Sequence, residues 1–356
     1  MKILHSADWH LDSPLVGRTE EQAKALRSAL LKIPDKVVTL CKNEGCDLLL
    51  LAGDLFDGAY TQESLYAVRT ALADAGVPVV IAPGNHDFCQ PNSPYLCETW
   101  PVNVHIFTHP VMESIVLPEL DCRIYGAGYE SMDCPALLKD FQAEGSERWH
   151  IGVVHGDPQQ ASSPYCPITP QQVRASGLHY LALGHIHKAG SFRAGEVLCA
   201  WPGCPMGRGY DEAGTKGALL VTLEDGVCAQ FLPMNTPRFY DETIDVGENA
   251  QYAVSSLLPP VETQDLYRIT LTGYSEPLDL NALGAAFPQV PNLELRDRTH
   301  PEIDLWSAVG EDTLEGVYFR ILHDGLDTES EKLQQHIKLA AKISRQILDG
   351  QEVTLP

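Results

Sequence analysis

The chain has 356 residues, of which 44% are hydrophobic and 21% are charged, as in an ordinary globular protein. This length exceeds what one hydrophobic core usually organises, so we expect two domains. The first residues run from Met1 straight into a His and an Asp, unlike an export signal, and no apolar run reaches the length that a bilayer requires. We therefore expect a cytoplasmic protein that does not bind membranes.

The net charge of −23 bears on the partner, since proteins that bind nucleic acid usually carry a basic surface. From Arg238 onward there are 9 Lys and Arg against 21 Asp and Glu, a net −12, which leaves 16 against 27, or −11, for the first 237 residues. Acidity is therefore about twice as dense in the C-terminal third. The ten cysteines are scattered without a Cys-x-x-Cys pair, which favours reduced structural thiols over a zinc site.

Apolar strands alternate with helical stretches in the first part of the chain. The four leucines at 48–51 indicate a strand buried on both faces of a sheet. Pro34 should interrupt the first long helical stretch, and Thr61 is suited to capping the next helix. The elements expected there are strands at residues 2–6, 48–51 and 79–81 and helices within residues 20–44 and 61–75. This alternation predicts an α/β fold with helices packed on a sheet.

The pattern loosens over residues 88–149 and then returns. Two later apolar stretches, 151–155 and 180–187, each lead into histidine. The other elements expected in this region are short strands near residues 104–107 and 123–125, a helix near 135–142, and a hairpin joining 218–223 to 228–232.

Asn235-Thr236-Pro237 resembles a domain boundary, so we predict one domain at residues 1–237 and a smaller α/β domain at 238–356. The smaller domain is expected to contain strands at 242–246, 266–272 and 292–297, and to close with an amphipathic helix at 330–348.

Residue types that bind metals follow five of the apolar strands. They are Asp8 and His10, Asp54 and Asp57, Asn85 and His86, His155, and His185 and His187. Any one of these groups alone is more often part of a solvated loop. Because all five follow strands, we expect them to project from the same sheet edge, where α/β proteins place their chemistry. Together they predict a metal site built from carboxylate, amide and imidazole ligands.

These residues resemble the motif set of the calcineurin-like metallophosphoesterases. The resemblance covers roughly residues 1–235 and is carried by Asp8-x-His10, Gly53-Asp54-x-x-Asp57, Gly84-Asn85-His86-Asp87, His155-Gly156 and Gly184-His185-x-His187. It implies a β-sandwich flanked by helices (αββα), followed here by a smaller C-terminal α/β capping domain. Within that superfamily, residues 4–14 and 180–188 are similar to bacterial DNA repair exonucleases of the SbcD and YhaO type.

The resemblance also implies two metal ions with Asp54 as their bridge. One ion is expected to bind Asp8, His10, Asp54 and His187, and the other Asp54, Asn85, His155 and His185. Each ion then has four protein ligands, which leaves room for a hydroxide and a phosphate oxygen. Mixed oxygen and nitrogen ligands suit manganese, iron or zinc, and the resemblance favours manganese.

A phosphodiester suits the charge of this centre. Two divalent ions contribute about +4, while Asp8, Asp54 and a hydroxide contribute about −3, so the loaded centre is about +1 and attracts a monoanionic diester. The metal-activated hydroxide attacks phosphorus, and His86 is placed to protonate the leaving oxygen. Asp57 is expected to orient His86, or else to cap a helix. Arg208 either contacts phosphate or is a surface charge.

Two functions follow. The first is a metal-dependent DNA exonuclease that works with a coiled-coil ATPase of the SbcC type, docked on the helix at 330–348, although that helix could instead pack on its own domain. A homodimer is also open. The second is a metallophosphoesterase for a small phosphodiester or phosphomonoester, which the acidic C-terminal third favours.

Overall fold

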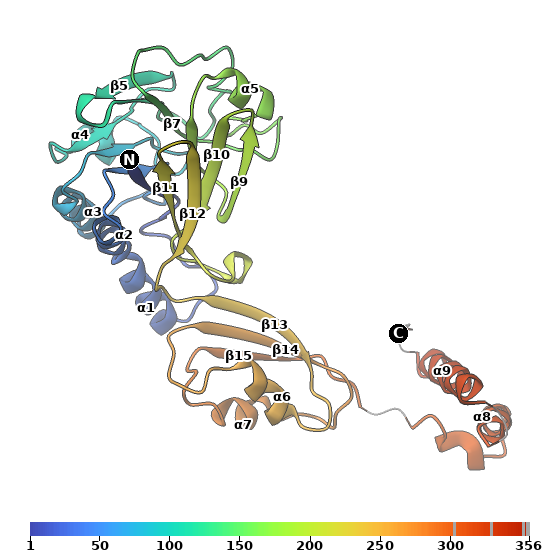
Figure 1. The fold of residues 1–356 in the computed structure, drawn as a ribbon. Helices are drawn as coiled ribbons and strands as arrows, with labels where there is room; N and C mark the ends of the chain where they lie inside the picture. The colour runs from blue at the N-terminus through green and yellow to red at the C-terminus, as the bar shows by residue number, and fades with distance from the viewer. Residues whose placement is uncertain (302–303, 328–329, 351–352, 354–356) are drawn as a thin grey trace. The chain divides into compact units, whose positions relative to one another are not determined.

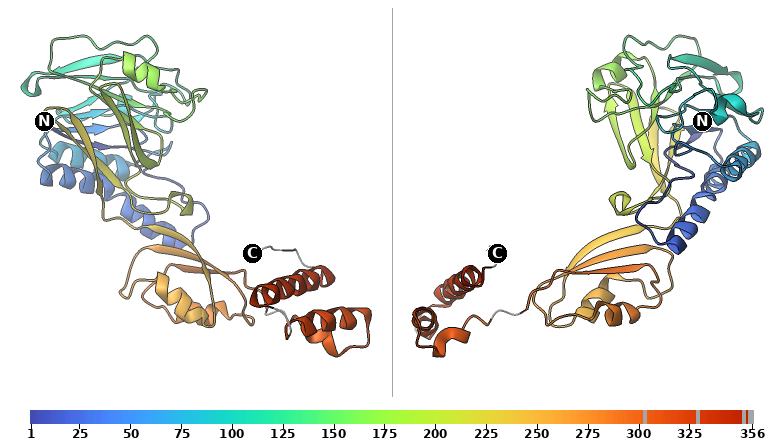
Figure 2. Two further views of the ribbon diagram at one scale, coloured as in Figure 1. Left: turned by 45° about the vertical axis from the view of Figure 1, so that its right-hand side comes forward. Right: turned by 180° about the vertical axis from the view of Figure 1, so that it is seen from behind.

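Two six-stranded sheets form the N-terminal part of the chain in a computed structural model, which describes residues 1–301, 304–327, 330–350 and 353. The first sheet has the order β12 (Val227–Pro233), β11 (Gly217–Leu223), β1 (Lys2–Ser6), β2 (Leu48–Leu51), β3 (Val79–Ile81) and β4 (Val104–Ile106). The second has the order β5 (Glu113–Leu117), β6 (Cys122–Gly126), β7 (Trp149–His155), β8 (Tyr180–Gly184), β10 (Val197–Gly203) and β9 (Lys188–Ala194). Figure 1 and Figure 2 show the two sheets facing each other.

The leucine strand β2 explains why the sheets stack. Successive side chains of a strand point to opposite faces, so the four leucines serve two cores. Leu48 and Leu50 pack between the sheets, whereas Leu49 and Leu51 face the helices on the outside. All four are fully buried, as the apolar run predicts.

Helices α1 (Glu20–Leu30), α2 (Ile33–Asn43) and α3 (Gln62–Asp74) cover the outer face of the first sheet. Pro34 interrupts the first helical stretch as predicted, because it lies in the first turn of α2, where a missing N–H costs nothing. Thr61 caps α3 by accepting a hydrogen bond from the Ser64 N–H, also as predicted. With α5 (Pro170–Ala175) on the second sheet, the expected αββα sandwich is confirmed.

The helix predicted near residues 135–142 is wrong. Leu137 and Leu138 are buried against the second sheet, but this segment forms turns. Cys134 is held in a bridge to Tyr165, and Asp140 has a left-handed backbone with φ 60°, which a helix cannot contain. Tertiary pairing therefore overrides the local pattern here.

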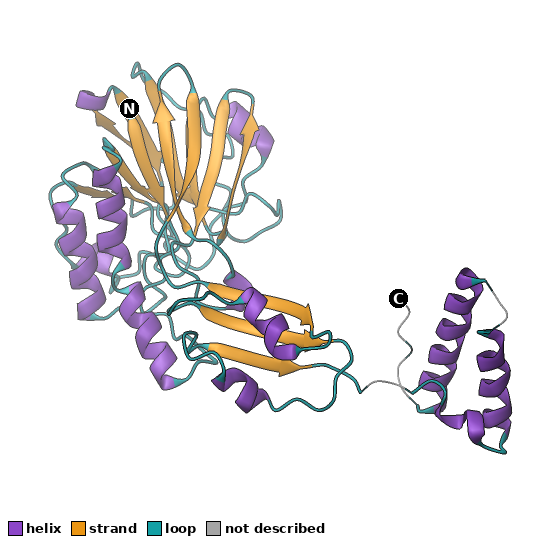
Figure 3. Cartoon of the chain, turned by 60° about the horizontal axis from the view of Figure 1, so that its bottom comes forward, coloured by secondary structure: helices purple, strands orange, loops and turns teal. Residues whose placement is uncertain are grey.

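The C-terminal part contains a three-stranded sheet and two groups of helices. The strand order is β13 (Phe239–Asp245), β14 (Leu266–Thr272) and β15 (Leu293–Asp297). Its helices are α6 (Ala250–Leu257), α7 (Leu280–Ala285), α8 (Leu314–Gly325) and α9 (Glu331–Leu348), with the short 3-10 turn η3 (Ser307–Gly310). The N-terminal part also contains α4 (Pro94–Cys97) and the 3-10 turns η1 (Pro118–Leu120) and η2 (Tyr210–Glu212). Helices α8 and α9 lie side by side around Phe319 and Ala341 (Figure 3).

The chain divides into two compact units. The first contains Met1–Asp241, Val261–Arg268 and Gln289–Glu294, and the second contains Glu242–Pro260, Ile269–Pro288 and Leu295–Pro356. Among the helices described, none has the length and apolar character to cross a bilayer.

Asp87 ties together the loops that follow β2 and β3. Its buried carboxylate accepts hydrogen bonds from the Leu55 N–H at 2.7 Å, the Gly84 N–H at 2.8 Å and the Tyr95 hydroxyl at 2.5 Å. The N–H groups of Asp54 and Phe56 donate to it at 3.2 and 3.3 Å. One side chain therefore sets the conformation of both loops.

We predict that Asp87→Ala lowers the free energy of unfolding by about 3 kcal/mol or more, because several buried donors lose their acceptor. Tyr95→Phe is the matched control, since it removes only one of these bonds and should cost about 1 kcal/mol. Urea unfolding of metal-free protein measures both. A cost for Asp87→Ala no larger than that for Tyr95→Phe would contradict this role.

Candidate metal centre

The predicted site residues come together where strands of both sheets end. Asp8 and His10 follow β1, Asp54 follows β2, and Asn85 follows β3, all in the first sheet. The remaining predicted residues, Asp57, His86, His155, His185 and His187, lie in the same loops or at the ends of β7 and β8 in the second sheet. The expectation of a single sheet edge is therefore wrong: the side chains converge from two stacked sheets.

Glycines allow the two sheets to approach this closely. A Cβ atom on Gly184 would lie 1.9 Å from the carbonyl oxygen of Ala52. Any larger residue at position 184 would therefore clash with the backbone that follows β2. A Cβ on Gly84 would lie 2.3 Å from Asp54 Oδ1. The glycines of the Gly-His and Gly-Asn pairs are thus steric requirements of the convergence.

The backbone is strained at four of these residues. Asp8, His10, Asp54 and His185 all have a left-handed conformation, with φ of 55°, 47°, 54° and 91°. Non-glycine residues rarely adopt this region, and where they do the surrounding structure usually enforces it at a functional site.

One group of donor atoms is formed by Asp8, His10 and His187, whose ligand-type atoms all lie within 4.8 Å of one another. The Nε2 atoms of His10 and His187 are 3.1 Å apart, and His187 Nε2 is 3.9 Å from Asp8 Oδ1. Asp8 and His10 are fully buried.

A second group is formed around His155. Its Nε2 lies 2.9 Å from Asn85 Oδ1 and 3.3 Å from Asp54 Oδ2, and His185 Nδ1 lies 3.3 Å from the same Asn85 oxygen. Burial and the neighbouring His155 lower the pKa of His185 to about 4, so its ring is neutral and can offer a lone pair.

Asp54 lies between the two groups. Its Oδ2 is 3.3 Å from His155 Nε2 in the second group and 3.7 Å from His10 Nε2 in the first. Burial raises the pKa of Asp54, but His155 and His10 lower it by more, so this buried carboxylate is ionised.

The donor set fits metal ions, because acceptor atoms face each other. His187 Nδ1 lies 2.6 Å from Glu212 Oε1 and His10 Nδ1 lies 3.3 Å from Asp57 Oδ1, so both rings hold their proton on Nδ1. Their Nε2 lone pairs then face each other across 3.1 Å. Two such lone pairs repel unless a proton or a metal cation is bound to them, and the adjacent Asp8 and Asp54 favour a divalent metal cation.

Asp57 and His86 form a pair at the edge of the centre. His86 Nδ1 lies 2.7 Å from Asp57 Oδ1, and 41% of the His86 side chain is exposed. Hydrogen bonding to Asp57 raises the pKa of His86 above its ordinary value, despite partial burial. The alternative that Asp57 caps a helix is wrong, because Thr61 caps α3.

Two more side chains contact the predicted site residues: Arg208, which the sequence left open as a phosphate contact or a surface charge, and Glu212, which had no signal in the sequence pattern. Arg208 forms a salt bridge with Glu212, in which Nη2 lies 2.7 Å from Oε1. Its Nη1 lies 3.7 Å from Asp57 Oδ2. Glu212 lies in the glycine-rich segment between β10 and β11, where no periodicity singles it out. Neither a strand end nor a motif marks it.

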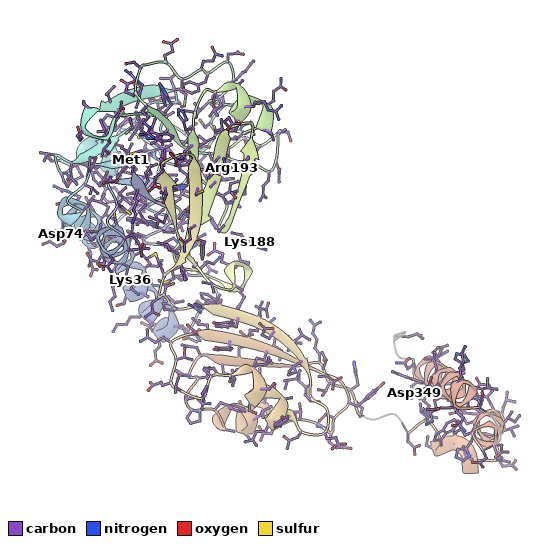
Figure 4. All side chains as sticks on the ribbon, in the orientation of Figure 1. Met1, Lys36, Asp74, Lys188, Arg193 and Asp349 are labelled. Atoms are coloured by element: carbon purple, nitrogen blue, oxygen red, sulfur yellow. The ribbon has the colours of Figure 1, made fainter. Side chains whose placement is uncertain are left out.

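Lys188 and Arg193 lie at different places along β9, as Figure 4 shows. Lys188 follows directly on His187, at the end of the strand that meets the centre. Arg193 donates a hydrogen bond to the Val227 carbonyl near the other end of the strand. Of these two cations, Lys188 is therefore the one nearer to the centre in the fold.

Comparison with known proteins agrees with this geometry. The calcineurin-like phosphoesterase family matches residues 1–189, more than half of the chain. Over 265 residues the chain is 32% identical to the uncharacterized metallophosphoesterase YhaO of Bacillus subtilis, covering 70% of this chain and 64% of that protein, less than two thirds of its length. Over 270 residues it is 27% identical to SbcD, a component of the nuclease SbcCD of the same organism, covering 64% of this chain and 67% of that protein.

Solved structures give weaker matches. A dimetal phosphatase from Danio rerio covers 66% of this chain at 13% identity and a TM-score of 0.41. The TT1561 protein of Thermus thermophilus covers 65% at 14% identity and a TM-score of 0.40. The family match over residues 1–189 shows that this chain belongs to the calcineurin-like metallophosphoesterases, hydrolases with a dinuclear metal site.

Proposed function

We propose that this chain is a DNA exonuclease that hydrolyses phosphodiester bonds with two divalent ions. The observation that carries the two-metal part of the proposal is the convergence of carboxylate, amide and imidazole donors around Asp54. In this proposal one ion binds Asp8, His10, Asp54 and His187, and the other binds Asp54, Asn85, His155 and His185. Manganese is our first choice of metal, with iron and zinc as alternatives of similar ligand preference.

The chain's own residues divide the remaining chemistry. Bound ions would supply Lewis acidity at a phosphate oxygen and lower the pKa of water. His86 is partly exposed, and its pKa is raised by the hydrogen bond to Asp57. In this proposal it donates a proton to the leaving oxygen as the bond between that oxygen and phosphorus breaks. Asp57 holds His86 by Nδ1 at 2.7 Å and so directs Nε2 outward.

The choice of DNA as substrate is supported by the 27% identity to a protein named as part of a nuclease. We propose residues 238–356 as a capping domain and its helices α8 and α9 as the dock for a coiled-coil ATPase. The support is that large apolar side chains stay exposed on these helices: Leu314 at 89%, Ile321 at 68% and Ile347 at 61%. Apolar side chains on one helix are the kind of anchor that a partner helix buries in helix-to-helix recognition.

A small phosphodiester or phosphomonoester is the second candidate substrate. The net −12 from Arg238 onward favours it, because an acidic capping domain repels DNA. The metal centre itself serves either substrate, so the choice depends on the surfaces around it.

The substrate choice is tested with manganese-loaded protein on linear duplex DNA, single-stranded DNA and bis(p-nitrophenyl) phosphate, each with and without a coiled-coil ATPase partner. We expect loss of DNA from the ends, faster with the partner. Efficient turnover of the small diester with intact DNA ends under every condition would contradict the nuclease proposal and favour the second candidate.

For the proton donor, we predict that His86→Ala lowers kcat by about 10²- to 10⁴-fold, as expected for loss of a general acid. Elemental analysis should find unchanged metal, since His86 is not among the proposed ligands. His109→Ala is the matched control, because His109 also pairs with a carboxylate, Glu130 at 3.0 Å, and is exposed. Full activity of His86→Ala would remove this role.

A further inference from the structure

The segment between β10 and β11, residues 204–216, reaches the metal centre through Glu212. This side chain is only 8% exposed although it is a carboxylate. Its Oε1 lies 2.6 Å from Nδ1 of His187, the shortest contact of that imidazole. A carboxylate accepts and does not donate, so this contact, which is shorter than the 3.2 Å from Arg208 Nη2 to the same nitrogen, favours the His187 proton on Nδ1.

Glu212 is itself held in place by the start of the same segment. Its Oε2 accepts the Arg208 N–H at 2.8 Å, and its Oε1 accepts Arg208 Nη2 at 2.7 Å. A Cβ on Gly207 would lie 2.6 Å from the Glu212 carbonyl oxygen, so the turn closes only around a glycine there. Both carboxylate oxygens therefore have fixed partners.

The backbone of His187 is fixed by the same segment. Its carbonyl oxygen accepts hydrogen bonds from Lys216 Nζ at 3.2 Å and from the Cys204 N–H at 3.4 Å. Lys216 is only 6% exposed, so its ammonium group has little water to bind in place of the His187 carbonyl. With its backbone held and its Nδ1 bonded to Glu212, the ring can point Nε2 in only one direction, toward His10 Nε2 at 3.1 Å.

We propose that Glu212 is a positioning residue for one of the two metal ions, an inference that rests on the proposed role of His187 as a ligand. The carboxylate orients the imidazole, keeps Nε2 free of its proton and makes that nitrogen a stronger donor to a cation. Arg208 extends the effect: it bonds Glu212 and approaches Asp57, the carboxylate that contacts both His10 and His86. One arginine thus links the two carboxylates that orient three histidines of the centre.

A purely structural ion pair is the competing explanation, and the two differ in what they predict. A buried Glu–Arg pair that only stabilises the fold affects unfolding and leaves metal affinity alone. A positioning carboxylate changes the affinity for the ion that its histidine binds, and only that ion. Metal binding in the absence of substrate therefore separates them.

The test is calorimetric titration of Mn²⁺ into the full chain after removal of metal with a chelator. Glu212→Gln keeps the size of the side chain and removes its charge. We expect the dissociation constant of one ion to rise about 10- to 100-fold, the usual effect of losing such a carboxylate, and that of the other ion to stay unchanged. The absorption spectrum of the Co²⁺-loaded protein should change at one site in parallel.

Asp211→Asn is the matched control, because it removes the same charge from the same turn at an exposed position. Wild-type affinity for both ions in Glu212→Gln, or equal weakening in Asp211→Asn, would overturn the proposal. If Glu212→Gln does not fold, Glu212→Asp keeps the charge but cannot reach Nδ1, and it should show the same one-site loss. Wild-type protein that binds two ions yet cleaves no phosphodiester would instead contradict the proposed function and leave the role of Glu212 standing.

Discussion

The constraint on which this structure depends is the meeting of lone pairs and negative charge at the point where two sheets end. His10 and His187 direct Nε2 atoms at each other across 3.1 Å, with buried Asp8 and Asp54 beside them. Divalent cations convert that repulsion into binding. Bringing these ligand atoms close enough to share a metal ion requires the sheets to approach closely. The glycine contacts and the left-handed backbones of the site residues are consequences of that approach.

Besides Asp8, four carboxylates around the centre differ in their partners. Asp54 lies between the two donor groups, whereas Asp57 contacts His86 and His10. Asp87 accepts backbone N–H groups and shapes the loops, and Glu212 holds His187 from behind. We therefore propose four roles for one type of group: metal ligand, support for a proton donor, scaffold for the loops and support for a ligand. Each assignment depends on what the carboxylate oxygens contact.

The sequence predicted the elements whose local pattern agrees with their final environment. The leucines of β2 are buried on both faces, and the strand at 266–272 has the bounds predicted for it. The division into two sheets was expected from the family resemblance and not from the strand pattern, since an apolar run shows that a strand is buried but not in which sheet it lies. Glu212 was missed for a related reason: it acts on a histidine 25 residues earlier, through a loop without periodicity. Likewise, the β-bridge between Cys134 and Tyr165 fixes the start of residues 135–142, which form turns where the sequence predicted a helix.

The central claim is that Asp54 belongs to both metal ions, and metal content tests it most directly. Equilibrium dialysis against Mn²⁺ followed by elemental analysis should find two ions per chain in the wild-type protein. Asp54→Ala should lose both, because its Oδ2 is the atom placed between the two donor groups. Normal occupancy of both ions in Asp54→Ala would contradict the account.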